Sequence, residues 1–347
     1  MWYSHFRLGS YAISFKCFDL DFMLNYLWFK KNPFVLLLLP LMLIYAFLTA
    51  WRRRLYRTGF FRSYRAKVPV VVVGNIMVGG NGKTPVVIAL ARYLKQKGLR
   101  VAVVSRGYGS HAPLYPYEVR NDSSYQEAGD EPLLIKKSTG ARVVIDPNRS
   151  RAVRSIEKEV DVILTDDGLQ HYALERDLEI VVIDGKRRFG NGFLMPMGPL
   201  REGLWRLKSV DFRICNGGTP APFEAGMTLK PNAVVSVHDK EQVLPPGTKV
   251  AVLAGIGDPT RVYETVKSLG YELTKKIAVK DHGAVCPDAL KSCQLPIIMT
   301  EKDFVKYNGN ELVNAFVLPV VAEIEPSFYG VFYAKLKPLL KIKTCVI

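Results

Sequence analysis

Residues 68–85 read VPVVVVGNIMVGGNGKTP, and this stretch decides the fold. The valines at its start favour a buried β-strand, because β-branched side chains pack well on a pleated surface. A glycine-rich loop follows at 74–82, and Lys83, Thr84 and Pro85 then open a stretch with helical spacing. Pro85 suits a first helical turn, where its missing N–H breaks no hydrogen bond. The order of strand, glycine-rich loop and helix is typical of a phosphate-binding loop.

This loop carries the groups that bind a nucleoside triphosphate. Its glycines let backbone N–H groups turn toward phosphate oxygens, Lys83 can reach the β- and γ-phosphates, and Thr84 can ligate Mg²⁺. We therefore predict ATP and Mg²⁺ as cofactors. The residues expected to contact the nucleotide are Asn75, Gly79, Gly80, Asn81, Gly82, Lys83 and Thr84.

The loop departs from common patterns at two positions. The pattern G-x-x-x-x-G-K-T requires glycine at position 77, where this chain has Met77. The form GGxGKT resembles the loop of the ParA-like P-loop class, but that class has lysine where this chain has Val78. A glycine-rich turn without a ligand is the alternative, and the strand and helix on either side of the loop count against it.

A second motif, VILTDDG at 162–168, is an apolar strand that ends in Asp166 and Asp167. In a P-loop enzyme an acidic residue at such a strand end lies close to Mg²⁺. Alone, the sequence DDG could be a simple turn. Together with Lys83 and Thr84, it predicts that both aspartates lie near the metal, directly or through water.

Phosphoryl transfer also needs cations around the migrating phosphate and a base near the attacking hydroxyl. Arg106, at the end of an expected strand, is our candidate for the phosphate, together with Arg149 and Arg201, although each could be structural. Asp130, in the sequence GDEP, is the candidate base and is expected at a helix start, where an N-cap is the alternative. His282 follows an expected strand, but a lone histidine in a loop is often not catalytic.

Beyond residue 67, short β-branched runs alternate with amphipathic helical stretches, which predicts a parallel sheet with crossover helices. The stretch 216–248, rich in Pro, Gly and charge, reads as an irregular connection or a small hairpin excursion. The expected strands are 68–73, 100–105, 142–145, 161–165, 179–183, 211–215, 249–254, 296–299 and 316–321, with helices at 84–97 and near 330–340.

Residues 34–51 form an apolar segment of eighteen residues without a charge. As a helix it would extend roughly 27 Å, which is barely enough to span a bilayer. Lys30 and Lys31 precede it and six arginines follow between 52 and 65, so we expect the downstream body in the cytoplasm. A cleaved signal peptide would export a domain that needs ATP, and no small-residue cleavage site follows. A buried core helix is a further alternative, and spanning and in-plane embedding both remain open.

The net charge of +16 is concentrated near this segment. Residues 1–67 hold eleven Lys and Arg against two Asp, a local charge of +9. This favours attraction to anionic lipid head groups over a nucleic-acid groove, although a bland basic surface is possible for the remainder. The five cysteines are scattered and lack metal-ligand spacing, so we predict reduced thiols and no structural zinc.

These patterns predict an α/β fold with a P-loop NTPase-like parallel sheet flanked by helices, a second smaller α/β lobe and an N-terminal membrane-associating helix. The length of 347 residues exceeds what one core usually organises. We expect an N-terminal extension at 1–22, the membrane-associating helix with its basic flank at 23–67, a P-loop kinase core at 68–220, and a hairpin excursion with the C-terminal α/β lobe at 221–347.

The order of the motifs resembles that of the tetraacyldisaccharide 4′-kinases of lipid A biosynthesis in Gram-negative bacteria. The resemblance runs from about residue 23 to 330 and includes the apolar segment and the loop at 74–85. The first 22 residues lie outside it, which suggests an extension or a start at Met23. The other matching motifs are RRLYR at 53–57, SRGYG at 105–109, GDEP at 129–132, TDDGLQH at 165–171, MGPLRE at 197–202, GIGDP at 255–259, DH at 281–282 and TEKD at 300–303.

The resemblance implies transfer of the γ-phosphate of ATP to the 4′-hydroxyl of an acylated glucosamine disaccharide 1-phosphate. The product would be lipid IVA, made at the cytoplasmic face of the bacterial inner membrane. In that family an aspartate and a histidine act as a dyad that removes the hydroxyl proton, and here these would be Asp130 and His282. The partners implied are the acylated disaccharide and membrane lipids, with no nucleic acid and no obligate protein partner.

The same resemblance assigns roles to other residues of this sequence. Lys83 and Thr84 would serve the phosphates and Mg²⁺, and Asp166 and Asp167 would hold the metal region. The residues that it places near the substrate or the catalytic centre are Tyr108, Arg149, His171, Arg201 and Glu202.

Two other classes of protein remain as alternatives. A ParA-like membrane ATPase would use the loop to drive assembly, and its turnover would not depend on an acceptor lipid. A nucleic-acid-binding ATPase would explain the high charge, and duplex DNA would stimulate its turnover in a salt-dependent way.

Overall fold

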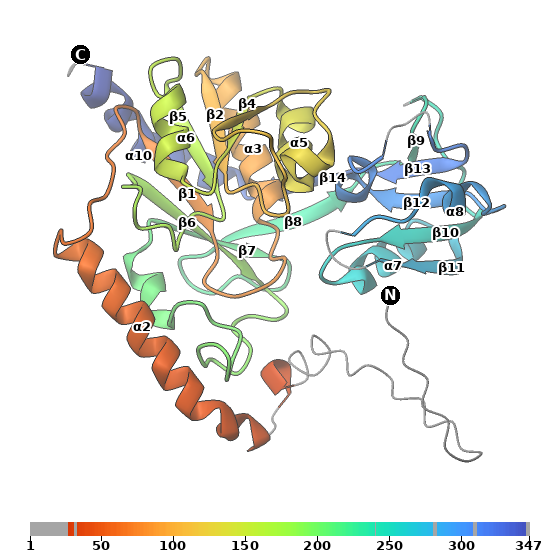
Figure 1. Cartoon of the computed structure of the whole chain (residues 1–347). Helices are drawn as coiled ribbons and strands as arrows, with labels where there is room; N and C mark the ends of the chain where they lie inside the picture. The colour runs from red at the N-terminus through yellow and green to blue at the C-terminus, as the bar shows by residue number, and fades with distance from the viewer. Residues whose placement is uncertain (1–26, 31–32, 240, 280–282, 308–310, 345–347) are drawn as a thin grey trace.

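The computed structural model describes residues 27–30, 33–239, 241–279, 283–307 and 311–344. Two sheets organise these residues into two lobes, and a long helix, α2, lies beside the larger lobe (Figure 1). We call the lobe with the nine-stranded sheet the large lobe and the lobe with the five-stranded sheet the small lobe.

The sheet of the large lobe has the order β14-β8-β7-β6-β1-β5-β2-β4-β3. Its central strand β1, Val70–Gly74, pairs in parallel with β5 on one side and β6 on the other. The pairs at the two edges, β3 with β4 and β8 with β14, are antiparallel. The other strands are β2 Val101–Ser105, β3 Tyr117–Val119, β4 Arg142–Ile145, β5 Val162–Asp166, β6 Leu178–Asp184, β7 Phe212–Asn216, β8 Ala225–Pro231 and β14 Val320–Ile324.

The valines of β1 explain why this strand lies at the centre of the sheet. Val71 and Val73 belong to the hydrophobic cluster on one face, and Val70 and Val72 belong to the cluster on the opposite face. Successive side chains of a strand point to opposite faces, so an unbroken apolar run fits a strand that is covered on both sides. Each buried valine contributes roughly 1.5–3 kcal/mol to folding.

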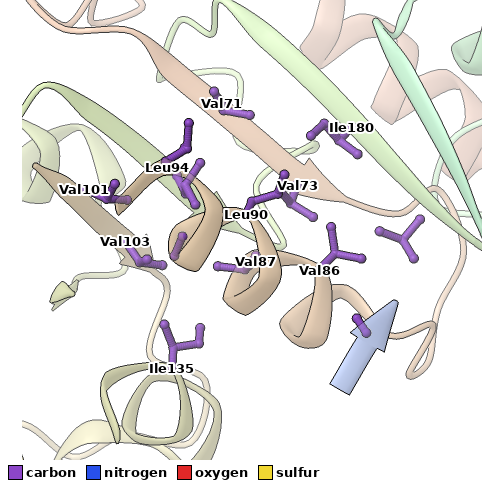
Figure 2. Close-up of a cluster of buried hydrophobic side chains, with 14 of the residues drawn as sticks. Val71, Val73, Val86, Val87, Leu90, Leu94, Val101, Val103, Ile135 and Ile180 are labelled. Carbon is purple, nitrogen blue, oxygen red and sulfur yellow. The ribbon is translucent and has the colours of Figure 1, made fainter. Parts of the chain in front are cut away.

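Helices cover both faces of this sheet. On one face, α3 directs Val86, Val87, Leu90 and Leu94 toward β1, as Figure 2 shows. The same cluster includes side chains of α5 and α10, whereas α6 packs on the other face. The helices of this lobe are α3 Lys83–Gln96, α4 Tyr125–Ala128, α5 Asp130–Thr139, α6 Arg149–Ile156, the 3-10 helix η2 Leu204–Ser209, and α10 Pro326–Thr344.

The small lobe has the strand order β11-β10-β12-β13-β9, in which β9 is antiparallel to β13 and the other pairs are parallel. Its helix α9 packs against α5 of the large lobe. The elements are β9 Val235–Ser236, β10 Lys249–Ala254, α7 Pro259–Ser268, β11 Glu272–Ala278, α8 Pro287–Lys291, β12 Ile297–Thr300, α9 Glu301–Phe304 and β13 Ala315–Leu318.

Most of the expected strands are confirmed within two residues at each end, and the helix at 84–97 corresponds to α3. Two expectations were wrong. The stretch 216–248 contains β8, which lengthens the large sheet, rather than only an irregular connection or a hairpin. The run 316–321 is divided between β13 of the small sheet and β14 of the large sheet. Segments on both sides of residue 220 therefore contribute to the large sheet.

The apolar segment forms the 3-10 helix η1, Pro33–Leu38, and the helix α2, Leu39–Arg57. Within the described residues, one helix is long and apolar enough to cross a membrane, and only 6% of its most apolar window is buried. Large apolar side chains along α2, among them Leu43, Phe47 and Trp51, are exposed. The alternative of a buried core helix is thereby excluded.

Candidate active site

A cavity of about 1920 Å³ lies at the carboxyl ends of the central strands of the large sheet. Its wall contains the glycine-rich loop at 79–82 and the start of α3, the turns that follow β2 and β5, and the face of α2 around Thr49. The small lobe closes another side through residues 256–258 and 300–302. The carboxyl ends of parallel strands meet at one edge of a sheet, which is where open α/β sheets bind ligands.

The glycine-rich loop is held in shape by its own side chains and by β7. Gly79 and Gly82 have positive φ angles of 100° and 88°. Asn75 donates a side-chain hydrogen bond to Gly79 O at 3.3 Å, and Asn216 at the end of β7 donates one to Asn81 O at 3.1 Å. The loop therefore reaches the N-terminus of α3 in one defined conformation, with the helix dipole directed into the cavity.

Lys83 and Thr84, the first two residues of α3, face the carboxylates at the end of β5. Lys83 Nζ lies 3.8 Å from Asp167 Oδ1 and 3.5 Å from Gly79 O. Thr84 Oγ1 donates to Asp166 Oδ2 at 3.4 Å. The two motifs that the sequence singled out are thus brought together, because β1 and β5 are neighbours in the sheet.

The two aspartates differ in their electrostatics. Burial raises the pKa of Asp166 to about 7, and repulsion from Glu131 adds to this effect. Burial also opposes ionisation of Asp167, but the cations of Lys83 and Arg201 outweigh it and hold the pKa of Asp167 below its usual range. Asp167 thus carries a stabilised charge, whereas Asp166 lacks a cation strong enough to offset its burial.

The residues at this place fit a magnesium ion that binds together with a nucleotide. Asp166 Oδ1 and Asp167 Oδ1 are buried and accept no hydrogen bond from the described part of the chain. Carboxylate and hydroxyl oxygens are the ligands that Mg²⁺ prefers, and it usually binds through one or two carboxylates plus phosphates and water. The described residues include no cluster of three or more His, Cys, Asp or Glu able to hold a metal by themselves.

Two arginines hold the turn that carries these carboxylates. Arg149, the first residue of α6, is buried and its Nη2 donates to Asp166 O at 3.1 Å and to Asp167 O at 2.8 Å. Burial lowers the pKa of Arg149 despite the nearby aspartates. Arg201 donates to Asp167 Oδ2 at 2.9 Å. Arg106 lines the cavity from the turn after β2, beside the exposed Tyr108.

Asp130 opens α5, as the sequence predicts, and its side chain is buried. Its Oδ1 accepts a hydrogen bond from Glu131 N at 2.8 Å, while its Oδ2 lies 3.8 Å from Lys302 Nζ and 3.9 Å from Lys306 Nζ. Glu131 lines the cavity. His282 lies outside the described residues, so its pairing with Asp130 stays a prediction.

The segment after Asp167 supplies a further wall of the cavity. His171 lines it, and burial, with the charge of Arg149 next, lowers the pKa of His171 to about 4. Its Nε2 is buried and has no hydrogen-bond partner among the described groups. Glu202 is buried and accepts hydrogen bonds from the Tyr172 hydroxyl and, at 2.8 Å, from Gln170 Nε2.

Several residues that the fold brings to this cavity or beside Asp130 could not be predicted from the sequence. The TEKD motif indicates no role for its Lys302, and Lys306 carries no signal beyond its position shortly after that motif, yet both lie beside Asp130. Asn216 is another, because only strand pairing places β7 beside the loop. Tyr45 and Arg53 of α2 also line the cavity, a placement that the composition of a membrane helix does not indicate.

The sequence also matches known proteins over most of its length. A family model described as tetraacyldisaccharide-1-P 4′-kinase matches residues 34–337. The tetraacyldisaccharide 4′-kinase of Aeromonas salmonicida is 50% identical over 322 residues, which cover 91% of this chain and 97% of that protein. The protein of the same name from Tolumonas auensis is 46% identical over 321 residues, with 91% and 98% covered.

A solved structure also matches this chain. The crystal structure of the "apo" form of LpxK from Aquifex aeolicus in complex with ATP superposes with a TM-score of 0.73 at 26% sequence identity. The match covers 87% of this chain and 99% of that chain.

Proposed function

The chain belongs to the tetraacyldisaccharide-1-P 4′-kinase family, and we propose that it transfers phosphate from ATP to its lipid acceptor at the cytoplasmic face of the bacterial inner membrane. Mg²⁺ and residues at the cavity take part in this transfer. The reaction moves the γ-phosphate of ATP to the 4′-hydroxyl of tetraacyldisaccharide 1-phosphate and forms lipid IVA. The observation that carries the residue assignment is the meeting of Lys83 and Thr84 with Asp166 and Asp167 in the wall of one cavity.

The glycine-rich loop binds the phosphates of ATP in this proposal. Backbone N–H groups at 79–82 and the dipole of α3 stabilise the negative charge of the phosphates, and Lys83 contacts the β- and γ-phosphates. The Lys83 ammonium lies 3.8 Å from Asp167, so it can turn toward the phosphate without a large movement. Arg106, exposed at the cavity wall, supports the charge that develops on the migrating group.

Thr84, Asp166 and Asp167 would hold Mg²⁺, since a hydroxyl and buried carboxylate oxygens without hydrogen bonds lie together there. When bound, the ion neutralises charge on the phosphate oxygens and orients them for in-line transfer. Arg149 fixes the backbone of both aspartates and so keeps their side chains directed into the cavity.

Asp130 acts as the base in this proposal, with His282 as its partner. The oxygen of the 4′-hydroxyl forms a bond to the γ-phosphorus, the bond from that phosphorus to the β–γ bridging oxygen breaks, and the hydroxyl proton passes to the Asp130 carboxylate. The position of Asp130 at the first turn of α5 favours its ionised form, because the helix N-terminus carries positive potential.

The acceptor side of the cavity is assigned to Tyr108, His171, Arg201 and Glu202, together with Arg149. All five line the cavity: Tyr108 is exposed, His171 Nε2 has no hydrogen-bond partner among the described groups, and Arg201 pairs with Asp167, which suits recognition of a polar sugar. Glu202 is already held by Tyr172 and Gln170, and it therefore orders this wall. Arg149 donates to the backbone of the turn that carries the two aspartates.

The location of α2 supports a membrane-bound acceptor. Each buried CH₂ of an acyl chain is worth about 0.8 kcal/mol, so a tetraacylated sugar stays in the bilayer and the kinase must meet it there. The exposed apolar side of α2 suits lipid contact, while Tyr45 and Arg53 of the same helix line the cavity. The arginines after residue 51 support a cytoplasmic position of the body, because basic residues beside a membrane helix favour that side.

Transfer of ³²P from γ-labelled ATP to tetraacyldisaccharide 1-phosphate, in detergent with Mg²⁺, tests the proposal directly. Wild type should label the lipid, and Lys83→Ala and Asp130→Ala should each lose most of this activity. ATP hydrolysis without labelled lipid would reject lipid phosphorylation and favour the ParA-like alternative. Full activity of Asp130→Ala would reject the role of that residue while leaving the lipid-kinase function in place.

A further inference from the structure

A buried ion pair lies in the small lobe where α9 meets the large lobe. Asp303, in α9, is fully buried, and Lys306, two residues past the end of that helix, is 6% exposed. Lys306 Nζ donates to Asp303 Oδ1 at 2.9 Å. Lysine and aspartate are rarely this buried unless they are paired, and the residues assigned to the phosphate-transfer step do not include this pair.

Asp303 is fixed on every side. Its Oδ2 accepts hydrogen bonds from Gly255 N at 2.9 Å and from Thr300 Oγ1 at 2.8 Å, and its own backbone N–H donates to Thr300 Oγ1 at 3.1 Å. Gly255 follows β10 and leads into residues 256–258, which line the cavity. The aspartate has therefore a single orientation, and it presents Oδ1 to Lys306.

Lys306 connects this anchored carboxylate to the candidate base. A lysine ammonium has three N–H donors, and here one faces Asp303 and a second donates to Gly283 O at 2.9 Å. The same Nζ lies 3.9 Å from Asp130 Oδ2 in the large lobe. Gly283 is the residue directly after His282 in the chain. The buried Lys306 thus lies beside the proposed base, Asp130, and donates to the residue that directly follows its proposed partner, His282.

The other charges facing Asp130 among the described residues are Lys302 and Glu131. Lys302 Nζ lies 3.8 Å from Asp130 Oδ2 and 3.3 Å from Glu131 Oε1. Lys302 is more exposed than Lys306 and lines the cavity. Lys306 is held by Asp303 and Gly283, so its position is determined by the fold.

We propose that Lys306, held by Asp303, is a positioning residue that fixes the Asp130 carboxylate and the backbone at Gly283 relative to each other for proton removal from the acceptor. This inference rests on the proposed role of Asp130. A side chain of the small lobe therefore orients the base. Its contacts within the described residues are Asp303, Gly283 and Asp130, and not the nucleotide loop or the acceptor wall. The inference also predicts that the charge at position 306, in addition to its packing, matters for the reaction.

The test compares Lys306→Met with Lys306→Arg in the full chain. Lys306→Met removes the cation and keeps an apolar stem of similar length, whereas Lys306→Arg keeps the charge. We expect Lys306→Met to lower kcat by about 100-fold, the loss that a misplacement of about 1 Å can cause, with the KM for ATP changed by less than about threefold. Lys306→Arg should recover most of the lost kcat.

The pH profile supplies a readout that a merely structural role would not change. Removal of a cation beside a carboxylate raises the pH at which the carboxylate ionises, so the acid limb of kcat/KM should move up by about one pH unit in Lys306→Met. The limb should return in Lys306→Arg. Lys335→Met, which removes an exposed lysine whose pair with Asp211 is not part of the cavity lining, is the charge control and should leave kcat and the profile unchanged.

Different failures can be told apart by adding Asp130→Asn. If Asp130→Asn retains transfer, the role of Asp130 fails and the inference fails with it. If Asp130→Asn is inactive but Lys306→Met keeps the kcat and profile of wild type, only the inference is overturned. If Lys306→Met does not fold, Thr300→Val loosens Asp303 while it keeps the lysine, and an unchanged kcat in that folded variant would overturn the inference as well.

Discussion

Gly82 is the glycine of the phosphate loop with the least space for a side chain. Its φ is +88°, and a Cβ there would lie 2.5 Å from Asn216 Nδ2, which donates to Asn81 O. A side chain in this strained conformation costs about 1–3 kcal/mol, so we expect Gly82→Ala to weaken ATP binding about tenfold or more. Isothermal titration with ATP and Mg²⁺ measures this.

The control for Gly82→Ala is Gly330→Ala, because Gly330 lies in α10 with no atom within 4 Å of an added Cβ. It should bind ATP like wild type and gain stability, since alanine is favoured over glycine in a helix by about 1 kcal/mol. Equal ATP affinity in wild type and Gly82→Ala would contradict the tight packing of the loop against β7.

His171 makes the folded chain sensitive to acid. Its pKa is about 4 in the folded chain, against an ordinary value of 6.5, so between these two pH values the unfolded chain binds a proton that the folded chain does not. Its contribution is therefore fully present above pH 6.5 and is lost as the pH falls toward 4. We expect thermal unfolding between pH 7.5 and pH 5 to show a larger loss of Tm for wild type than for His171→Gln. Parallel losses would argue against a neutral, buried His171.

At the residue scale, the sequence predicted those site residues whose contacts follow from neighbouring strands. Lys83 and Thr84 stand directly after β1, and Asp166 stands at the end of β5, so one strand pairing brings them together. Lys306 and Asn216 reach the site only through the packing of one lobe on the other and through the position of β7 in the sheet. Such placements depend on long-range contacts that spacing along the chain does not encode.

At the scale of elements, α2 is an apolar helix in which no residue is buried. Phe47 is 63% exposed and Leu43 is 56% exposed. We expect the double variant Leu43→Glu, Phe47→Glu to fold normally but to lose binding to vesicles of bacterial phospholipids, because two charges in an apolar face oppose insertion by about 2.5–3.5 kcal/mol each at the centre of a span. Vesicle sedimentation measures the bound fraction.

A matched control for α2 is Val331→Glu, which adds a charge at an exposed apolar position of α10. It should sediment with vesicles as wild type does. Retained membrane binding in the double variant would mean that α2 does not attach the protein to lipid.

The hydrophobic pattern does not predict all of the strands correctly. The run at 316–321 is apolar throughout and looks like one strand, yet Pro319 separates β13 from β14. Proline lacks the N–H that a continuous strand would donate, so the chain leaves one sheet there and joins the other. β8 was missed because Gly226 and Pro231 have low strand propensity, which pairing with β7 and β14 overrides.

At the scale of the whole molecule, ion pairs link the two lobes across the cavity. Arg261 of α7 donates to Asp184 at the end of β6 at 2.6 Å, and Arg187 lies 3.4 Å from Asp258. Asp184 is buried, but it also accepts hydrogen bonds from Lys186 N and Arg187 N, which remain when Arg261 is replaced. Because both arginines are partly exposed, each pair is worth about 1 kcal/mol. We expect Arg261→Met to raise the KM for ATP by up to about fivefold, with little change in kcat.

Steady-state kinetics at two salt concentrations check this expectation, since salt should weaken the wild-type pair as the substitution does. Lys249→Met breaks a pair with Glu272 inside the small lobe and should leave the KM unchanged. A KM for Arg261→Met equal to that of wild type would show that the lobes hold together without this pair.

The topology of the large sheet also has a consequence for synthesis of the chain. β14 and α10 are synthesised after all strands of the small lobe, yet their side chains, among them Ile324 and Phe332, complete the core around β1. All strands of the small lobe precede them, so that lobe can fold while the large lobe still lacks an edge strand and a covering helix. During this interval α2 is already available to the membrane, and the nascent large lobe exposes apolar surface that a chaperone would recognise.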